Sequence, residues 1–168
     1  MFSVIIPLYN KSPYIGRAID SVLGQSFHEY EIIVINDGST DGGDQLIEKK
    51  YSSHIKLIHQ HNQGVSVARN TGIANANFNY VAFLDADDFW HPDFLLSVQI
   101  AISKDPSAGI IGTNHINIDA DHALATESSL MNKEEVTPTA IYYNADEYFK
   151  QAVYNTLVWT SATIIKKE

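Results

Sequence analysis

The sequence predicts an α/β protein with a Rossmann-like, mostly parallel sheet that carries helices on both faces. Apolar runs alternate with helical patterns along residues 2–113, which is typical of βα units joined by right-handed crossovers. The 168 residues, 45% of them hydrophobic, suit one domain with a substantial core. Polar residues follow three of the apolar runs, and parallel sheets bind ligands at these strand ends.

The first unit is a strand followed by a helix. The segment "FSVIIPLY" (2–9) is a nearly continuous apolar run, as expected of a buried strand. Ser12 is the expected cap of the next helix, with Pro13 at its first position. Apolar residues then recur on one helical face, namely Ile15, Ala18, Ile19, Val22 and Leu23.

The same unit repeats as far as residue 113. Further strands are expected at 30–36, 55–60, 80–84 and 108–113. The helices between them are expected at 45–51, 64–76 and 93–103. No internal sequence repeat or low-complexity tract interrupts this order.

Residues 114–168 have a different character. The segment 114–140 is more polar and has little periodicity, which predicts an excursion over the surface. A short helix is expected near 145–153, and "VWTSATIIKKE" (158–168) begins a β-like run. The sequence therefore divides into 1–113 and 114–168.

Charge and composition exclude several classes of function. The net charge of −9 has the wrong sign for binding a nucleic-acid backbone. An anionic ligand would need local help from a cation or from backbone amides. The absence of cysteine excludes disulfides and thiolate metal sites. No signal peptide pattern occurs, and no apolar run reaches the ~20 residues that span a bilayer, so a cytoplasmic location is expected.

An aspartate cluster, "FLDADDFW" (83–90), directly follows a predicted strand. Two carboxylates ~4 Å apart repel by about 4 kcal/mol at an effective dielectric constant of 20, so they tend to bind a proton or a cation. Mg²⁺ and Mn²⁺ prefer oxygen ligands, and Mg²⁺ usually takes one or two carboxylates with phosphates and water. The alternative is that Asp87 or Asp88 caps the next helix while Asp85 bonds to a turn.

Two other clusters have both a functional and a purely structural interpretation. In "NDGSTDG" (36–42), Asp37 could accept a hydrogen bond from a nucleotide base while Gly38 lets the chain pass close to the ligand. A surface turn is the alternative. In "SVARNTG" (66–72), Arg69 could pair with a carboxylate such as Asp37 or contact a nucleotide. A solvated arginine is the alternative there.

Three segments, in this order and spacing, resemble the nucleotide-binding half of family 2 glycosyltransferases, which are inverting enzymes with a GT-A fold. They are "SVIIPLYNKSPYIGRAIDSVLGQSFHEYEIIVINDGSTDGG" (3–43), "NQGVSVARNTGIANA" (62–76) and "FLDADDFWHPDFL" (83–95). The resemblance covers residues 2 to about 113, and "TSATIIKKE" (160–168) is similar as well. It implies that 1–113 is a nucleotide-sugar (donor) binding subdomain and 114–168 the start of the acceptor side.

The resemblance also implies roles for individual residues. The family holds the nucleoside, often a uridine, with residues matching Pro7, Tyr9 and Asp37. Arg69 is expected near the nucleotide and near Asp37. Asp87 matches the family's ligand for Mn²⁺ or Mg²⁺, and Asp85 matches an acid beside the ribose or in the outer shell of the metal. A cation there would offset the charge of the protein when an anionic donor binds.

The reaction that the resemblance implies is attack of an acceptor hydroxyl on the anomeric carbon of a nucleoside-diphosphate sugar, with inversion. This reaction needs a general base. Family members carry a further acidic segment after a run like "TSATIIKKE", so we expect the chain to be truncated and the base to lie beyond Glu168. Acids that could substitute, although their context favours a solvated surface, are Asp119, Asp121, Glu127, Glu134, Glu135, Asp146 and Glu147.

Two alternatives come from other classes of protein. "FLDADDF" superficially resembles the Asp-x-Asp of phosphohydrolases that form an aspartyl phosphate, although this would leave "NDGSTDG" and "ARN" without a role. The chain could also be a non-catalytic module that binds a nucleotide sugar. For the whole enzyme, the family analogy favours a saccharide or lipid-linked acceptor, polysaccharide biosynthesis and a peripheral place at the inner face of a membrane.

Overall fold

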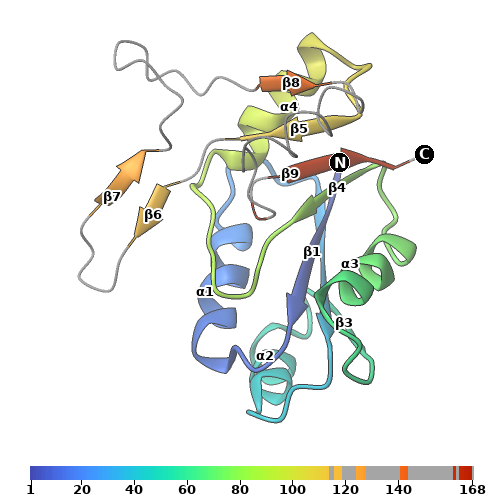
Figure 1. Ribbon diagram of the computed structural model, residues 1–168, viewed down its shortest axis with the longest axis vertical. Helices are drawn as coiled ribbons and strands as arrows, with labels where there is room; N and C mark the ends of the chain where they lie inside the picture. Colours follow the sequence, from blue (N-terminus) through green and yellow to red (C-terminus); the bar gives the residue numbers. More distant parts are fainter. Residues whose placement is uncertain (114–115, 119–123, 128–140, 144–160, 162, 168) are drawn as a thin grey trace.

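A seven-stranded sheet with helices on both faces forms the protein (Figure 1). The computed structural model describes residues 1–113, 116–118, 124–127, 141–143, 161 and 163–167. The strands of this sheet are β1 (Phe2–Leu8), β2 (Tyr30–Asn36), β3 (Lys56–His59), β4 (Tyr80–Phe83), β5 (Ile110–Gly112), β8 (Ile141–Tyr143) and β9 (Thr163–Lys166). The helices are α1 (Ser12–Leu23), α2 (Gly43–Tyr51), α3 (Val65–Ala74) and α4 (Phe94–Lys104).

The strand order is β3-β2-β1-β4-β9-β5-β8. Strands β3, β2, β1 and β4 are parallel neighbours. Strand β9 lies antiparallel between β4 and β5, so β5 runs in the same direction as β4 (Figure 1). The predicted α/β class with a mostly parallel sheet is therefore confirmed, and two antiparallel strands from the 114–168 segment, β9 and β8, complete the sheet.

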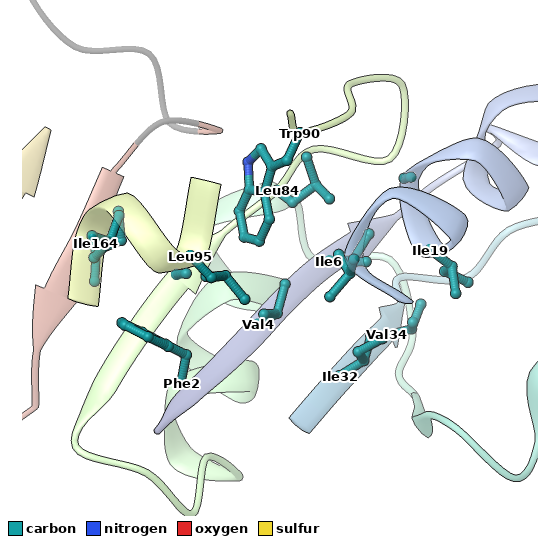
Figure 2. Close-up of a cluster of buried hydrophobic side chains, with 14 of the residues drawn as sticks. Phe2, Val4, Ile6, Ile19, Ile32, Val34, Leu84, Trp90, Leu95 and Ile164 are labelled. Atoms are coloured by element: carbon teal, nitrogen blue, oxygen red, sulfur yellow. The ribbon is translucent and has the colours of Figure 1, made fainter. Parts of the chain in front are cut away.

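Apolar side chains on the two faces of the sheet form two core layers. Alternate residues of β1, including Val4 and Ile6, pack with α1, α2 and α4, and Figure 2 shows part of this layer. Ile5 points to the other face, where α3 covers it. Gly72 of α3 allows this close packing, because a Cβ at that position would lie 2.4 Å from a methyl carbon of Ile5. Each fully buried aliphatic side chain stabilises the fold by roughly 1.5–3 kcal/mol.

The start of α1 differs from the sequence prediction. The helix begins at Ser12 itself, after Lys11, and Pro13 lies in its first turn. Ser12 does not cap the helix; instead its backbone N–H donates to the carboxylate of Asp41, 2.8 Å away. Asp41 belongs to the loop after β2, so a residue distant in sequence satisfies one of the free N–H groups of the helix.

The segment after β5 is described only in part. A separate hairpin pairs β6 (Ile116–Ile118) with β7 (Leu124–Glu127). The helix expected near 145–153 lies outside the described residues. Among the helices that the structure describes, none is long and apolar enough to cross a membrane.

Candidate functional site

The carboxyl ends of β1, β2 and β4 meet at one edge of the sheet and form the walls of a cleft of about 520 Å³ with α3. All six residues expected to bind the donor line this cleft: Pro7, Tyr9, Asp37, Arg69, Asp85 and Asp87. The parallel register explains the convergence, because parallel strands place their carboxyl ends on the same side. The position of these residues is thus shown, and their roles stay predictions.

Asp37 is a buried carboxylate, with 3% of its surface exposed, and the segment after β3 surrounds it. Its Oδ1 accepts hydrogen bonds from Gln60 Nε2 at 2.7 Å and from Gln63 N at 2.9 Å. Its Oδ2 accepts one from Gly64 N at 2.8 Å. A carboxylate offers about four acceptor positions, so one remains for a ligand in the cleft.

Gly38 allows the segment after β3 to approach Asp37. Its φ of +76° is in the left-handed region, and a Cβ there would lie 3.0 Å from Asn62 N. The sequence interpretation expected this glycine to make room for a ligand. The structure instead gives it a close contact with the backbone of the segment that binds Asp37.

Arg69 pairs with Asp85 and not with Asp37. Its Nη2 donates to Asp85 Oδ1 at 2.7 Å, and both side chains are largely shielded, with 20% and 33% exposed. This corrects the suggested Asp37 pairing, since Gln60, Gln63 and Gly64 already occupy that carboxylate. Arg69 Nε is buried and has no hydrogen-bond partner among the described residues.

Asp87 faces a lysine. Lys11 Nζ donates to Asp87 Oδ2 at 2.6 Å, and each side chain is 43% exposed. The Asp87 hydrogen bond and charge raise the pKa of Lys11 above its usual value, so the amine stays protonated at neutral pH. Arg17 Nη2 donates to the backbone oxygen of Asp87 at 2.9 Å and lies over the ring of Phe89.

A buried glutamine fixes the loop that follows the aspartates. Gln25 Nε2 donates to His91 O at 2.7 Å, and Gln25 Oε1 accepts from Leu95 N at 2.9 Å. Trp90 stacks on Phe94 with ring centres 4.2 Å apart and packs into the core (Figure 2). These contacts anchor the loop that carries Asp87 against α4. The Asp87 side chain remains in the lining of the cleft.

The donor set fits a hard divalent cation that is shared with a ligand. Asp85 and Asp87 supply carboxylate oxygens in the cleft. Among the residues that the structure describes, no group of three or more His, Cys, Asp or Glu side chains could hold a metal alone. Such a site suits Mg²⁺ or Mn²⁺, which bind through one or two carboxylates and complete their coordination with phosphates and water.

Sequence reasoning missed two residues that shape the cleft. Lys11 follows the polar end of β1, and its place beside a strand end is a signal that could have included it. Ser161, just before β9, accepts a hydrogen bond from Asp85 N at 3.0 Å, and its backbone oxygen accepts one from Trp90 Nε1. Nothing in the local sequence indicates that contact, because 76 residues separate Ser161 from Asp85.

Comparison with known proteins identifies the family of this chain. The model of one protein family, Glycosyl transferase family 2, matches residues 3–162. The chain belongs to glycosyl transferase family 2. Among curated relatives, an Escherichia coli chondroitin synthase is 30% identical over 172 residues, covering 94% of this chain and 25% of the relative. Family membership thus rests on nearly the whole chain and not only on the aspartate motif.

Solved glycosyltransferases share the fold. Staphylococcus aureus TarS 1–349 in complex with UDP-GlcNAc is 30% identical, with a TM-score of 0.58, over 65% of this chain and 32% of that one. The mannosyltransferase PcManGT from Pyrobaculum calidifontis, in complex with GDP-Man and Mn²⁺, is 27% identical with a TM-score of 0.61, over 65% and 34%. The fold is therefore the GT-A fold of family 2 glycosyltransferases. The chain spans about a quarter or less of the length of several curated relatives.

Proposed function

We propose that this chain carries the donor site of a metal-dependent, inverting glycosyltransferase. The donor is a nucleoside-diphosphate sugar, with a UDP-sugar favoured, and the acceptor is a hydroxyl of a saccharide or a lipid-linked glycan. The observation that carries the proposal is the convergence of three strand ends on one cleft in a chain of this family. The neighbours with UDP-GlcNAc and with GDP-Man and Mn²⁺ support the class of donor.

The nucleoside would bind between β1 and β2. Asp37 has one acceptor position left for a base N–H, and its burial makes a hydrogen bond there strong. Tyr9 is 47% exposed at the end of β1 and offers an aromatic face to a base. An acceptor and an aromatic surface match a uracil ring, which presents an N–H between two carbonyl groups.

The diphosphate would lie near Asp85 and Asp87, which would hold Mn²⁺ or Mg²⁺. The cation, when bound, neutralises charge that develops on the leaving nucleoside diphosphate. Arg69 orients Asp85 through their ion pair, and its guanidinium places a positive charge in the wall of the cleft. A chain with a net charge of −9 needs these local positive charges to bind an anionic donor.

The acceptor hydroxyl would attack the anomeric carbon from the face opposite the leaving group, with a base removing its proton. Of the acids considered for that role after residue 113, all but Glu127 lie outside the described residues, and Glu127 ends β7. The proposal for this chain is therefore donor binding, with 114–168 as the start of the acceptor side. The family match argues against the phosphohydrolase alternative, which uses the same aspartates as a nucleophile.

The test is calorimetric titration with UDP, GDP and dTDP, each with Mn²⁺ and with EDTA. Binding that requires Mn²⁺ and prefers one base is expected. Asp88→Ala is a matched control for Asp87→Ala, because its side chain has no hydrogen bond among the described residues and does not line the cleft. If none of the three nucleotides binds in Mn²⁺, the proposed donor site is wrong. Donor binding without transfer to any acceptor would identify a binding module.

A further inference from the structure

Lys11 occupies the carboxylate that the proposed function assigns to the cation. Its Nζ lies 2.6 Å from Asp87 Oδ2, and both side chains line the donor cleft. A lysine ammonium and a divalent cation compete for the same oxygen, because both need its lone pairs and repel each other at close range. The position of Lys11 therefore has a direct consequence for binding of the cation.

The backbone of Lys11 is fixed, so the contact follows from the fold. Its carbonyl oxygen accepts hydrogen bonds from Tyr14 N and Ile15 N, each at 3.0 Å, at the start of α1. The next residue is held by Asp41, as described above. Further along α1, Arg17 Nη2 donates a hydrogen bond to the backbone oxygen of Asp87. Asp87 is therefore held by its backbone oxygen through Arg17 of α1 and by its side chain through Lys11, the residue before α1.

The contacts of Lys11 and Arg17 with Asp87 differ in whether they leave its carboxylate free to bind a ligand. Arg17 binds the backbone oxygen and leaves the carboxylate free, whereas Lys11 binds a carboxylate oxygen. Both side chains of the Lys11–Asp87 pair are 43% exposed, so the pair can open at low cost. Lys11 can then turn to another anion in the same cleft, such as a diphosphate oxygen.

We propose that Lys11 couples binding of the divalent cation to binding of the nucleoside diphosphate. In the free protein, Lys11 neutralises Asp87 and opposes binding of the cation alone. When a diphosphate enters the cleft, Lys11 exchanges Asp87 for a phosphate oxygen and releases the carboxylate. The inference rests on the proposed function for the identity of the ligands, and it goes beyond that function by assigning the order in which they bind.

The test compares Lys11→Met with Lys49→Met in this chain. Lys49 lies exposed on the last turn of α2 and outside the cleft, so both variants lose one positive charge but only one of them frees Asp87. Electron paramagnetic resonance of free Mn²⁺ gives the affinity for Mn²⁺, first without nucleotide and then with saturating UDP. Circular dichroism melting checks that the variants are folded.

Without nucleotide, Lys11→Met should bind Mn²⁺ at least threefold more tightly than Lys49→Met. UDP should increase the affinity for Mn²⁺ by a factor that is at least threefold smaller in Lys11→Met than in Lys49→Met. By linkage, Mn²⁺ should increase the affinity for UDP by the same smaller factor. Affinities for Mn²⁺ within twofold of each other in the two variants would overturn the inference. If the unchanged protein binds UDP with Mn²⁺ in that case, the donor site stands and only the role of Lys11 falls. Failure of the unchanged protein to bind any nucleoside diphosphate would instead remove the proposed function.

Discussion

Replacing Asp37 by asparagine tests whether this carboxylate organises the cleft as well as facing a ligand. Three donors surround it: Gln60 Nε2, Gln63 N and Gly64 N, at 2.7, 2.9 and 2.8 Å. In Asp37→Asn the amide oxygen can keep the first two, but the amide NH₂ then faces the Gly64 N–H, and two donors oppose each other. If the amide were flipped, its NH₂ would instead face the two donors Gln60 Nε2 and Gln63 N.

The expected loss of stability follows from the number of hydrogen bonds that the substitution breaks. One buried donor left without an acceptor costs about 1–3 kcal/mol, and the two remaining bonds lose the charge that strengthened them. We therefore expect the free energy of unfolding to fall by about 1–3 kcal/mol, and the melting temperature by about 2–4 °C for each kcal/mol in a chain of this size. Complete removal in Asp37→Ala would leave all three donors unsatisfied and is expected to destabilise further.

Urea unfolding followed by circular dichroism measures this free energy. Asp88→Asn is the matched control, because it makes the same change of charge at a carboxylate that has no hydrogen bond among the described residues. Unfolding energies of Asp37→Asn and Asp88→Asn that agree within about 0.5 kcal/mol, the usual range for surface substitutions, would refute the anchoring role. Calorimetry on the same samples should also show a weaker preference among UDP, GDP and dTDP in Asp37→Asn, because the amide replaces the acceptor for a base N–H.

Three further changes test other parts of the structure. Asp87→Ala should abolish Mn²⁺-dependent binding of nucleoside diphosphate in calorimetry, and the melting temperature should fall by no more than about 4 °C, because this half-exposed pair contributes about 0.2–1 kcal/mol. Unchanged affinity would exclude Asp87 as a ligand of the cation. Gln25→Ala should lower the free energy of unfolding by about 1–3 kcal/mol, since it leaves Leu95 N without its acceptor, and an unchanged urea midpoint would contradict that. Gly72→Ala should cost about 1–3 kcal/mol by overpacking against Ile5, whereas a melting temperature equal to that of the unchanged protein would mean that α3 shifts freely.

The sequence predicted the first five strands and four helices because their apolar patterns are local. Strand β2 has the expected limits of 30–36, and β1, β3 and β4 differ by only one or two residues at their ends. The start of α1 was assigned one residue too late, because Lys11 offers no capping side chain and Asp41 supplies the acceptor from a different loop. Local propensity cannot identify a partner that only tertiary folding brings to the helix.

The composition of the candidate site was also predictable, whereas its pairing was not. Pro7 lies near the end of β1, and Asp37 and Asp85 follow β2 and β4. Parallel strands bring such residues to one edge whatever the details of packing. Which charge pairs with which depends on the reach of each side chain. Arg69 therefore meets Asp85, and Lys11, which the motif analysis did not include, meets Asp87.

The sequence alone determined the family, the α/β class and the strand ends that carry the polar residues, since each depends on residue types at short spacing. Tertiary structure decided the insertion of β9 between β4 and β5, the three hydrogen bonds that occupy Asp37, and the contact of Lys11 with Asp87. These features join residues from 23 to 86 positions apart. Contacts at such separations form only where the folded backbone brings two segments together, and patterns of period 2 or 3.6 along the chain carry no information about them.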